Sequence, residues 1–281
     1  MRVISSRQSL VPLVELNTGI LMPQLGLGVF EMDDAQIQEA LLTAFELGYR
    51  SIDTAAVYQN EEAVGKAIRA SGLDRSELFI TTKLWGTDHA ADRSGPALDA
   101  SLGRLGLDYV DLYLIHWPET ERGQYVEAWD GLERLRDAGK TRAIGVCNFL
   151  PSHLAELAAL GYSTPAVNQV ELHPMHQQEL TRAYDDAAGI VTESWAPLAR
   201  GRILESDTIL GIAQELGVTP GQVTIRWHLQ SGLVVIPKSQ SPARLAENID
   251  VFDFELTEKQ MAAIATLDEG YLTDPSLLRF Q

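Results

Sequence analysis

The most informative part of the sequence is Gly48-Tyr49-Arg50-Ser51-Ile52-Asp53-Thr54-Ala55-Ala56-Val57-Tyr58-Gln59-Asn60-Glu61-Glu62-Ala63-Val64-Gly65. It predicts a buried strand over residues 50–53 that ends in a carboxylate. A short loop then presents Tyr58, and Asn60 is expected to cap a helix that carries acids in its first turn. The loop between strand and helix therefore holds both an acid and a tyrosine, which suits a proton-transfer site.

The same order of strand and helix repeats along the chain. Segments of helical period, such as 34–46, 125–138, 152–159 and 179–188, alternate with short apolar runs typical of buried parallel strands. Those runs number eight and are 27–29, 50–53, 78–83, 109–116, 142–147, 166–172, 190–195 and 233–237. Eight alternating units in about 250 residues predict an α/β fold, the (β/α)8 TIM barrel.

A doubly wound parallel sheet is the alternative architecture. It would usually divide into two domains and carry a phosphate-binding fingerprint. The only candidate, Gly26-Leu27-Gly28, lacks the third glycine of that fingerprint, and we interpret it as a tight turn. No linker rich in Pro, Gly or Ser divides the chain, so we expect residues 1–281 to form a single barrel domain.

The two ends of the chain depart from strict alternation. In residues 10–26, Asn17-Thr18-Gly19 stands between apolar runs and predicts a β-hairpin, which could plug the bottom of the barrel. After the last strand, residues 241–249 and 257–267 predict two extra helices. The tail 271–281 has no clear period, and we expect it to close a substrate pocket loosely.

Composition excludes several classes of protein. The net charge of −17 argues against binding to nucleic acid or to anionic membranes, and no apolar run is long enough for a membrane span. The single cysteine, Cys147, excludes an intramolecular disulfide, and residues 1–16 lack the features of a secretory signal. We therefore expect a cytoplasmic protein. His173 and His176 lack a metal-binding signature, so no metal is expected.

Polar residues recur where the predicted strands end, and barrel enzymes carry their chemistry at that end. Any one of them could be a hydrogen-bonded core group. Repetition on strand after strand is harder to explain in that way and favours an active site. The residues are Asp53, Lys83, His116, Cys147, Asn148, Asn168, Gln169, Trp195 and Lys238.

Four residues on three neighbouring strands supply the parts of a proton-transfer site. The unperturbed pKa of tyrosine is about 10, so Tyr58 is a poor acid by itself. An ammonium such as Lys83 at about 4 Å favours the phenolate by about 4 kcal/mol at an effective dielectric of ~20. Asp53 would keep that lysine protonated and oriented. A neutral His116 could then hydrogen-bond to a substrate oxygen.

Several ordered motifs extend this pattern over most of the chain, from Leu16 to Asn248. With residues 48–65 they resemble the aldo-keto reductase superfamily. Trp195 and Phe30 make the chain most similar to the prokaryotic 2,5-diketo-D-gluconate reductase type. The further motifs are Thr81-Thr82-Lys83-Leu84-Trp85, Leu114-Ile115-His116-Trp117-Pro118, Ile144-Gly145-Val146-Cys147-Asn148-Phe149, Asn168-Gln169-Val170-Glu171-Leu172-His173-Pro174 and Ile236-Pro237-Lys238-Ser239.

The resemblance implies reduction of aldehydes and ketones by hydride transfer from a nicotinamide. Tyr58 would be the general acid, Lys83 would lower its pKa, Asp53 would pair with the lysine, and His116 would orient the carbonyl. Trp195 would stack on the nicotinamide, although packing at the barrel rim is an alternative role. The other implied cofactor contacts are Asn148 and Gln169 at the carboxamide, Leu198 and Ile236 in the matching loops, and Glu247 and Asn248 at the adenine.

An anion site is predicted after the last strand. Lys238, Ser239, Ser241 and Arg244 gather at the start of the next helix, where amides and cations favour a phosphate monoester. No acid in residues 236–244 is available for a ribose hydroxyl, so we expect NADPH rather than NADH. A solvated pair of surface cations is the alternative.

The substrate pocket and the partners follow from the same resemblance. It implies that Phe30, Trp85 and Trp117 wall an apolar pocket over a small carbonyl substrate, while rim packing is again the alternative. We expect a monomer.

The rival function is a non-catalytic NADP(H)-sensing subunit on the same barrel. The complete set of four residues favours an enzyme, while the fold alone would not decide. A hydrolase or isomerase ranks third and predicts no cofactor binding.

Overall fold

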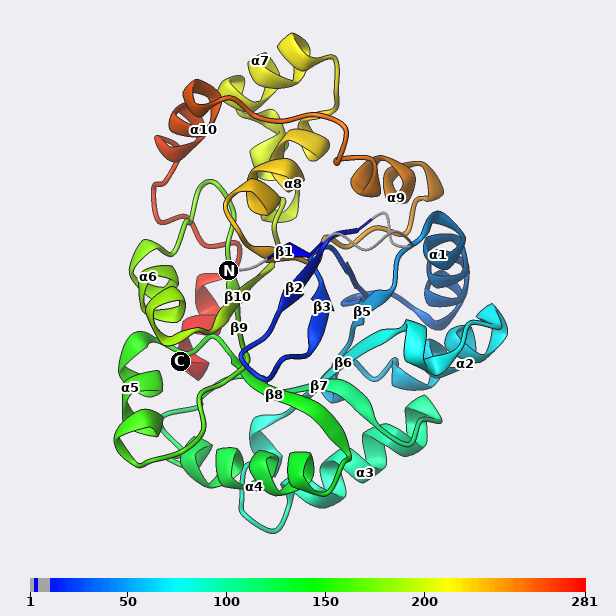
Figure 1. The fold of residues 1–281 in the computed structure, drawn as a ribbon, viewed down its shortest axis with the longest axis vertical. Coiled ribbons are helices and arrows are strands. Elements are labelled where there is room, and N and C mark those ends of the chain that lie inside the picture. Colours follow the sequence, from blue (N-terminus) through cyan, green and yellow to red (C-terminus); the bar gives the residue numbers. More distant parts are fainter. Residues whose placement is uncertain (1–2, 5–10) are drawn as a thin grey trace.

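A ring of parallel strands forms the centre of the computed structural model, which describes residues 3–4 and 11–281 (Figure 1). The eight strands of this sheet follow one another in chain order. The ring closes where Leu25 bridges Val235, and the amide of Gly26 donates to the Val235 carbonyl at 2.9 Å. The expected (β/α)8 barrel is confirmed. Its strands are β4 (Leu27–Gly28), β5 (Ser51–Asp53), β6 (Phe79–Leu84), β7 (Val110–Ile115), β8 (Thr141–Cys147), β9 (Val167–Glu171), β10 (Val191–Trp195) and β11 (Val234–Val235).

Two glycines allow the short first strand to fit between its neighbours. A Cβ atom at Gly26 would lie 2.9 Å from the Ser51 hydroxyl oxygen, and one at Gly28 would lie 3.2 Å from the Ile236 carbonyl oxygen. The expected tight turn at this motif is therefore wrong, because Gly28 belongs to β4 itself. Close backbone approach is the reason for glycine here.

The helices pack around the outside of the ring (Figure 1). In the first of them, Asp33 forms a capping box with Gln36, and Gly48 ends the helix in the left-handed region at a φ of 102°. Its face with Ile37, Leu41 and Phe45 is buried in the barrel's outer core. The helices are α1 (Asp34–Leu47), α2 (Glu61–Ser71), α3 (Ser94–Leu105), α4 (Tyr125–Asp137), α5 (Pro151–Ala159), α6 (Glu179–Ala188), α7 (Asp207–Leu216), α8 (Pro220–Gln230), α9 (Pro242–Ile249) and α10 (Glu258–Ala265).

The predicted hairpin closes one end of the barrel. Strands β2 (Leu13–Glu15) and β3 (Leu21–Pro23) pair in antiparallel fashion, and β1 (Val3–Ile4), which the sequence did not indicate, adds a third strand. Val14 and Met22 join a buried cluster with inward residues of the barrel strands such as Leu112. Leu10, the first residue of the expected hairpin segment, lies outside the described residues.

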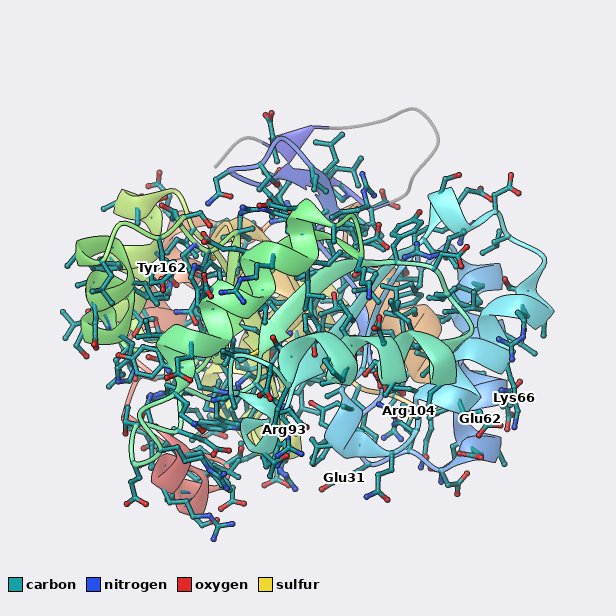
Figure 2. All side chains as sticks on the ribbon, turned by 90° about the horizontal axis from the view of Figure 1, so that it is seen from below. Glu31, Glu62, Lys66, Arg93, Arg104 and Tyr162 are labelled. Carbon is teal, nitrogen blue, oxygen red and sulfur yellow. The ribbon has the colours of Figure 1, made fainter. Side chains whose placement is uncertain are left out.

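The C-terminal tail lies at the opposite end of the barrel from the hairpin (Figure 2). Residues Pro275–Phe280 form 3₁₀ turns, although the sequence shows no period there. The amide of Glu119 donates to the Phe280 carbonyl at 2.7 Å, which ties the tail to the loop after β7. Glu31 marks the same end of the molecule in Figure 2. Among the described residues, no helix combines the length and apolarity that crossing a bilayer needs.

Candidate active site

Asp53 and Lys83 form a buried ion pair where β5 and β6 end. Lys83 Nζ lies 2.5 Å from Asp53 Oδ1 and donates to the Thr54 carbonyl at 3.0 Å. Lys83 is fully buried, which by itself would lower its pKa, but Asp53, Tyr58 and Cys147 together outweigh burial and leave the pKa raised. The ammonium is therefore held in place and stays charged.

Tyr58 follows β5 in the 3₁₀ turn Ala56–Tyr58, and its ring centroid lies 5.2 Å from Lys83 Nζ. Burial raises the pKa of Tyr58 to about 12, while the Lys83 ammonium acts in the opposite direction. The expected lowering by lysine is thus present but smaller than the effect of burial. The phenol keeps its proton at neutral pH, as a proton donor requires.

His116 completes this group directly after β7. Its ring centroid lies 5.6 Å from that of Tyr58 and 5.3 Å from that of Trp85. Burial and the nearby Lys83 lower the pKa of His116 well below its usual range, so the imidazole is neutral. Its Nδ1 has no hydrogen-bond partner within the part of the chain that the structure describes.

Hydrogen bonds between neighbouring strand ends hold the loop that carries Tyr58. Asn60 precedes α2, but its side chain does not cap this helix. It accepts from the Thr54 hydroxyl at 2.7 Å and donates to the Val29 carbonyl at 3.0 Å. The expected cap is therefore wrong, because this buried amide satisfies loop groups instead. The next residue, Glu61, accepts from the Thr82 hydroxyl at 2.6 Å and pairs with Arg104.

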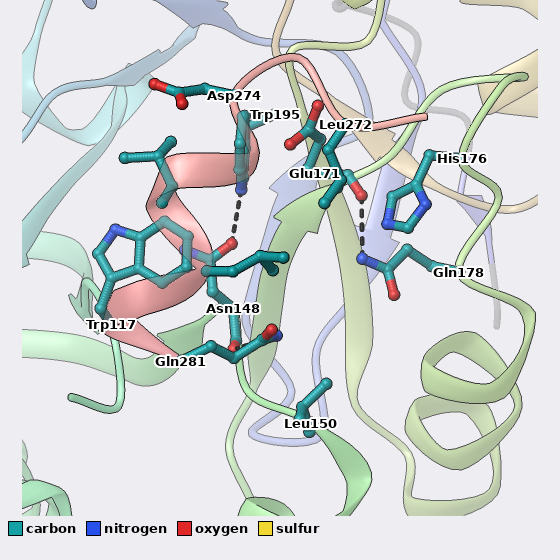
Figure 3. A pocket seen from close by; sticks show the side chains of 12 residues that line it. Trp117, Asn148, Leu150, Glu171, His176, Gln178, Trp195, Leu272, Asp274 and Gln281 are labelled. Carbon is teal, nitrogen blue, oxygen red and sulfur yellow. Dashed lines mark hydrogen bonds between the residues drawn. The ribbon is translucent and has the colours of Figure 1, made fainter. Parts of the chain in front are cut away.

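Asn148 connects His116 to Trp195. It adopts the left-handed region with a φ of 60°, and its Nδ2 donates to the His116 carbonyl at 3.1 Å. Its Oδ1 accepts from Trp195 Nε1 at 2.9 Å (Figure 3). Trp195 is half-buried at the end of β10. Two of the three residues expected at the nicotinamide, Asn148 and Trp195, are thus in direct contact.

Gln169 was expected to bind the carboxamide of the nicotinamide, but its side chain is bonded to two acids inside the barrel instead. Its Nε2 donates to Asp53 Oδ2 and to Glu193 Oε2, both at 2.8 Å. Its Oε1 lies 3.9 Å from the Cys147 thiol, which donates to it. Both amide hydrogens are used inside the barrel, so in this conformation the side chain does not offer them to a carboxamide. Glu193 was not among the expected site residues. An acid within a strand that is otherwise apolar could have indicated it as a site residue.

The predicted anion site forms a compact loop. The amide of Ser241 donates to the hydroxyl of buried Ser239 at 3.2 Å, and exposed Lys238 donates to the Glu31 carbonyl at 3.2 Å. Arg244 is exposed on α9, and among the described residues it forms no ion pair. Of the remaining expected contacts, Ile236 and Asn248 are buried, Leu198 is half-buried and Glu247 is exposed.

Aromatic rings surround Tyr58 and His116. Phe30 lies 4.8 Å from the Tyr58 ring centroid and is 45% exposed, so it stands at the rim. The ring centroid of Phe280, in the tail, lies 5.6 Å from that of Trp85 and 5.9 Å from that of Trp117. The three expected wall residues therefore gather at the site. The tail was expected to close the pocket, and it does so by placing the Phe280 ring against Trp85 and Trp117.

A cavity of roughly 150 Å³ lies beside this group, between Trp195 and the tail (Figure 3). Asn148 and Trp117 line it from the barrel, and Leu278 and Gln281 line it from the tail. Asp53, Tyr58, Lys83 and His116 are not among its lining residues, so it adjoins the ion pair rather than containing it. In the described ranges, no group of three or more His, Cys, Asp or Glu side chains could hold a metal ion.

Comparison with known proteins identifies the family. A model of the Aldo/keto reductase family matches residues 23–269. This chain belongs to that family. An aldo-keto reductase of Mycolicibacterium vanbaalenii is 54% identical over 92% of this chain and 93% of that protein. Methylglyoxal reductase DkgA of Escherichia coli K12 is 50% identical over 93% of this aldo-keto reductase and 95% of the relative.

Solved structures share the barrel of this aldo-keto reductase. A mutant of Gox0644 in complex with NADPH has a TM-score of 0.90 and 45% identity, and the match covers 93% of this chain and 96% of that one. The Bombyx mori aldo-keto reductase in complex with NADP has a TM-score of 0.89 and 37% identity, and the match covers 96% of this chain and 97% of that one. The chain is therefore an oxidoreductase of this family.

Proposed function

We propose that this aldo-keto reductase reduces small aldehydes and ketones, including dicarbonyls and keto sugars, with NADPH and with Tyr58 as the general acid. The observation that carries the proposal is the placement of a protonated Tyr58 ring 5.2 Å from the Lys83 ammonium, which is itself paired with Asp53. The relative named methylglyoxal reductase supports a small dicarbonyl among the substrates.

Each residue of the group has one part in the reaction. NADPH, when bound, supplies the hydride. Tyr58 donates its phenolic proton to the carbonyl oxygen and becomes a phenolate, which the Lys83 ammonium stabilises. Asp53 holds that ammonium 2.5 Å away and keeps it protonated. The neutral imidazole of His116 orients the carbonyl oxygen toward Tyr58, and Phe30, Trp85, Trp117 and Phe280 exclude water around it.

The chain's own residues fit a phosphorylated nicotinamide cofactor. Lys238 and Arg244 are exposed cations beside Ser239 and Ser241 at the start of α9, whose N-terminal amides favour an anion. The half-buried face of Trp195 beside the cavity suits stacking of a planar ring. Complexes of Gox0644 and the Bombyx mori enzyme with NADPH and NADP support this choice of cofactor.

The setting of the reaction is part of the same proposal. We place the enzyme in the reducing cytoplasm as a monomer, acting on small molecules and not on nucleic acid or membranes. The buried free thiol of Cys147 and the acidic net charge of −17 support this setting. Gel filtration with light scattering would measure the mass against the 30.9 kDa of one chain.

The test measures NADPH consumption by absorbance with methylglyoxal, phenylglyoxal and a diketo sugar acid. We expect turnover by the wild type and a loss of at least about a hundredfold in kcat for Tyr58→Phe, because the proton donor is removed. Binding of NADPH, followed by quenching of Trp fluorescence, should be unchanged in this variant. Tight NADPH binding without turnover of any carbonyl would instead favour the NADP(H)-sensing subunit.

A further inference from the structure

A second acid lies inside the barrel next to the ion pair of the active site. Glu193 points inward from β10 and is 1% exposed. Its Oε2 accepts a hydrogen bond from Gln169 Nε2 at 2.8 Å, and the same nitrogen donates to Asp53 Oδ2 at 2.8 Å. Asp53 Oδ1 in turn contacts Lys83 Nζ at 2.5 Å. One amide group therefore joins Glu193 to Asp53 and, through it, to Lys83.

The charges of this chain of contacts balance only if Glu193 is neutral. Among the described residues, the Gln169 amide contacts two buried carboxyl groups, Asp53 and Glu193, and the one ammonium in this group is that of Lys83. A second buried carboxylate without a cation of its own is strongly disfavoured, so the fold favours its protonated form. Asp53 is the carboxylate in direct contact with Lys83, which leaves the proton on Glu193.

We propose that Glu193 is a positioning residue of the reductase site. As a neutral acid, it anchors the amide of Gln169, which holds the Asp53 carboxylate against Lys83 and so fixes the ammonium near Tyr58. Gln169 can donate one amide hydrogen to Asp53 without penalty only while its second amide hydrogen also has an acceptor, because an unpaired buried N–H is costly. The inference rests on the proposed reduction, in which Lys83 stabilises the Tyr58 phenolate.

Loss of the proton from Glu193 would slow the reduction. A second negative charge near Lys83 opposes formation of the Tyr58 phenolate, so proton donation becomes harder. Burial raises the pKa of Glu193 to about 8, with a smaller contribution from Asp53, and Gln169 and Lys83 act in the opposite direction. The other ionisable group that faces it is the buried thiol of Cys147, whose own pKa is held well above its usual range by burial.

The experiment compares wild type with Glu193→Gln across pH 6–10, since glutamine keeps the acceptor oxygen but cannot ionise. We expect kcat of the wild type to fall as pH rises through about 8. In the variant, this decline should move up by about one pH unit or more, while kcat near neutral pH stays within about threefold. Glu193→Leu removes the acceptor and should lower kcat at all pH values by about tenfold, with KM for NADPH unchanged.

Asp185 provides the matched control. It is also a fully buried acid, and burial raises its pKa to about 7, but it contacts Asn168 and Thr192 on the outer side of the strands. Asp185→Asn should leave the pH profile of kcat unchanged. Identical profiles of wild type and Glu193→Gln would overturn the proposal, as would an equal shift in Asp185→Asn.

A readout without turnover separates this inference from the proposed function. Infrared difference spectra of wild type against Glu193→Gln should show the carbonyl band of a protonated carboxylic acid at neutral pH, and this band should disappear as pH rises through about 8. Its absence at neutral pH would overturn the inference even if the enzyme reduces carbonyls. Its presence in an enzyme that reduces no carbonyl would reject the proposed function while leaving the protonated Glu193 in place.

Discussion

At the scale of the residue, Lys83 contributes both to stability and to the acidity of Tyr58. It is fully buried, and its only counter-charge in direct contact is Asp53 at 2.5 Å among the described residues. Removing one member of a buried ion pair leaves the other charge unpaired, which costs about 3–5 kcal/mol. Removing the ammonium also takes away the group that stabilises the phenolate. The two effects can be separated, because Asp53 can be neutralised as well.

We therefore predict different outcomes for Lys83→Met and for the double variant Lys83→Met/Asp53→Asn. The single variant should lose about 3–5 kcal/mol in the free energy of unfolding, and the double variant should regain most of it. Both should lose about a hundredfold or more in kcat, since neither has the ammonium. Urea denaturation and steady-state kinetics measure the two quantities. A double variant as unstable as the single one would contradict this account.

At the scale of the element, the C-terminal tail forms part of the pocket wall. Thr273 donates its amide to Glu171 at 2.7 Å, and Phe280 places its ring against Trp85 and Trp117. Gln281 Nε2 donates to the Asn148 carbonyl at 3.3 Å, which brings the tail to a residue expected at the cofactor. The sequence suggested that the tail covers the site loosely. In the structure it contacts both sides of the site.

Deletion of residues 271–281 should change substrate selection more than the chemical step. We expect KM for the aromatic substrate phenylglyoxal to rise about tenfold, because contact with the Phe280 ring is worth roughly 1.5 kcal/mol, while KM for methylglyoxal changes less. Phe280→Ala should reproduce most of this effect, and Phe280→Leu should restore part of it. An unchanged ratio of kcat/KM for the two substrates after deletion would show that the tail does not select substrate.

At the scale of the whole molecule, the acid Asp185 links stability to pH. It is fully buried in α6, where Thr192 Oγ1 donates to it at 3.0 Å, and burial raises its pKa to about 7. A raised pKa means that the folded state binds the proton more tightly than the unfolded state does. Stability is therefore greatest below the unfolded pKa of about 4 and is lost as pH rises to about 7.

We propose that residues 1–281 unfold as one cooperative domain, so this linkage acts on the whole chain. A single thermal transition is expected, and its free energy of unfolding should include a loss of up to about 4 kcal/mol between pH 4 and 7 from Asp185. Asp185→Asn should remove that contribution and be more stable than wild type at pH 8. Calorimetry across this range measures both, and two separate transitions would reject the single domain.

Much of the fold was predictable because each strand and helix is defined by a local pattern. The apolar runs and the glycines after helices mark β6, β7 and β9 within one residue or two of where they lie. The bonds of Asn60 were not predictable in this way. Its position before α2 indicates a cap, but a partner from the loop after β4 takes its amide. Local patterns cannot show such competition, because it depends on which segments the barrel brings together.

The barrel, the hairpin and the residue types at the strand ends follow from local patterns, because hydrophobic period, turn residues and the order of motifs are properties of neighbouring positions. The contacts between those residues arise in the folded barrel. Gln169 joins Asp53 across 116 positions of sequence, Phe280 returns to the rings of Trp85 and Trp117, and Glu193 enters the group around Lys83. The physical reason is that a closed barrel brings distant strands into contact inside one small volume, where buried polar groups must find their partners.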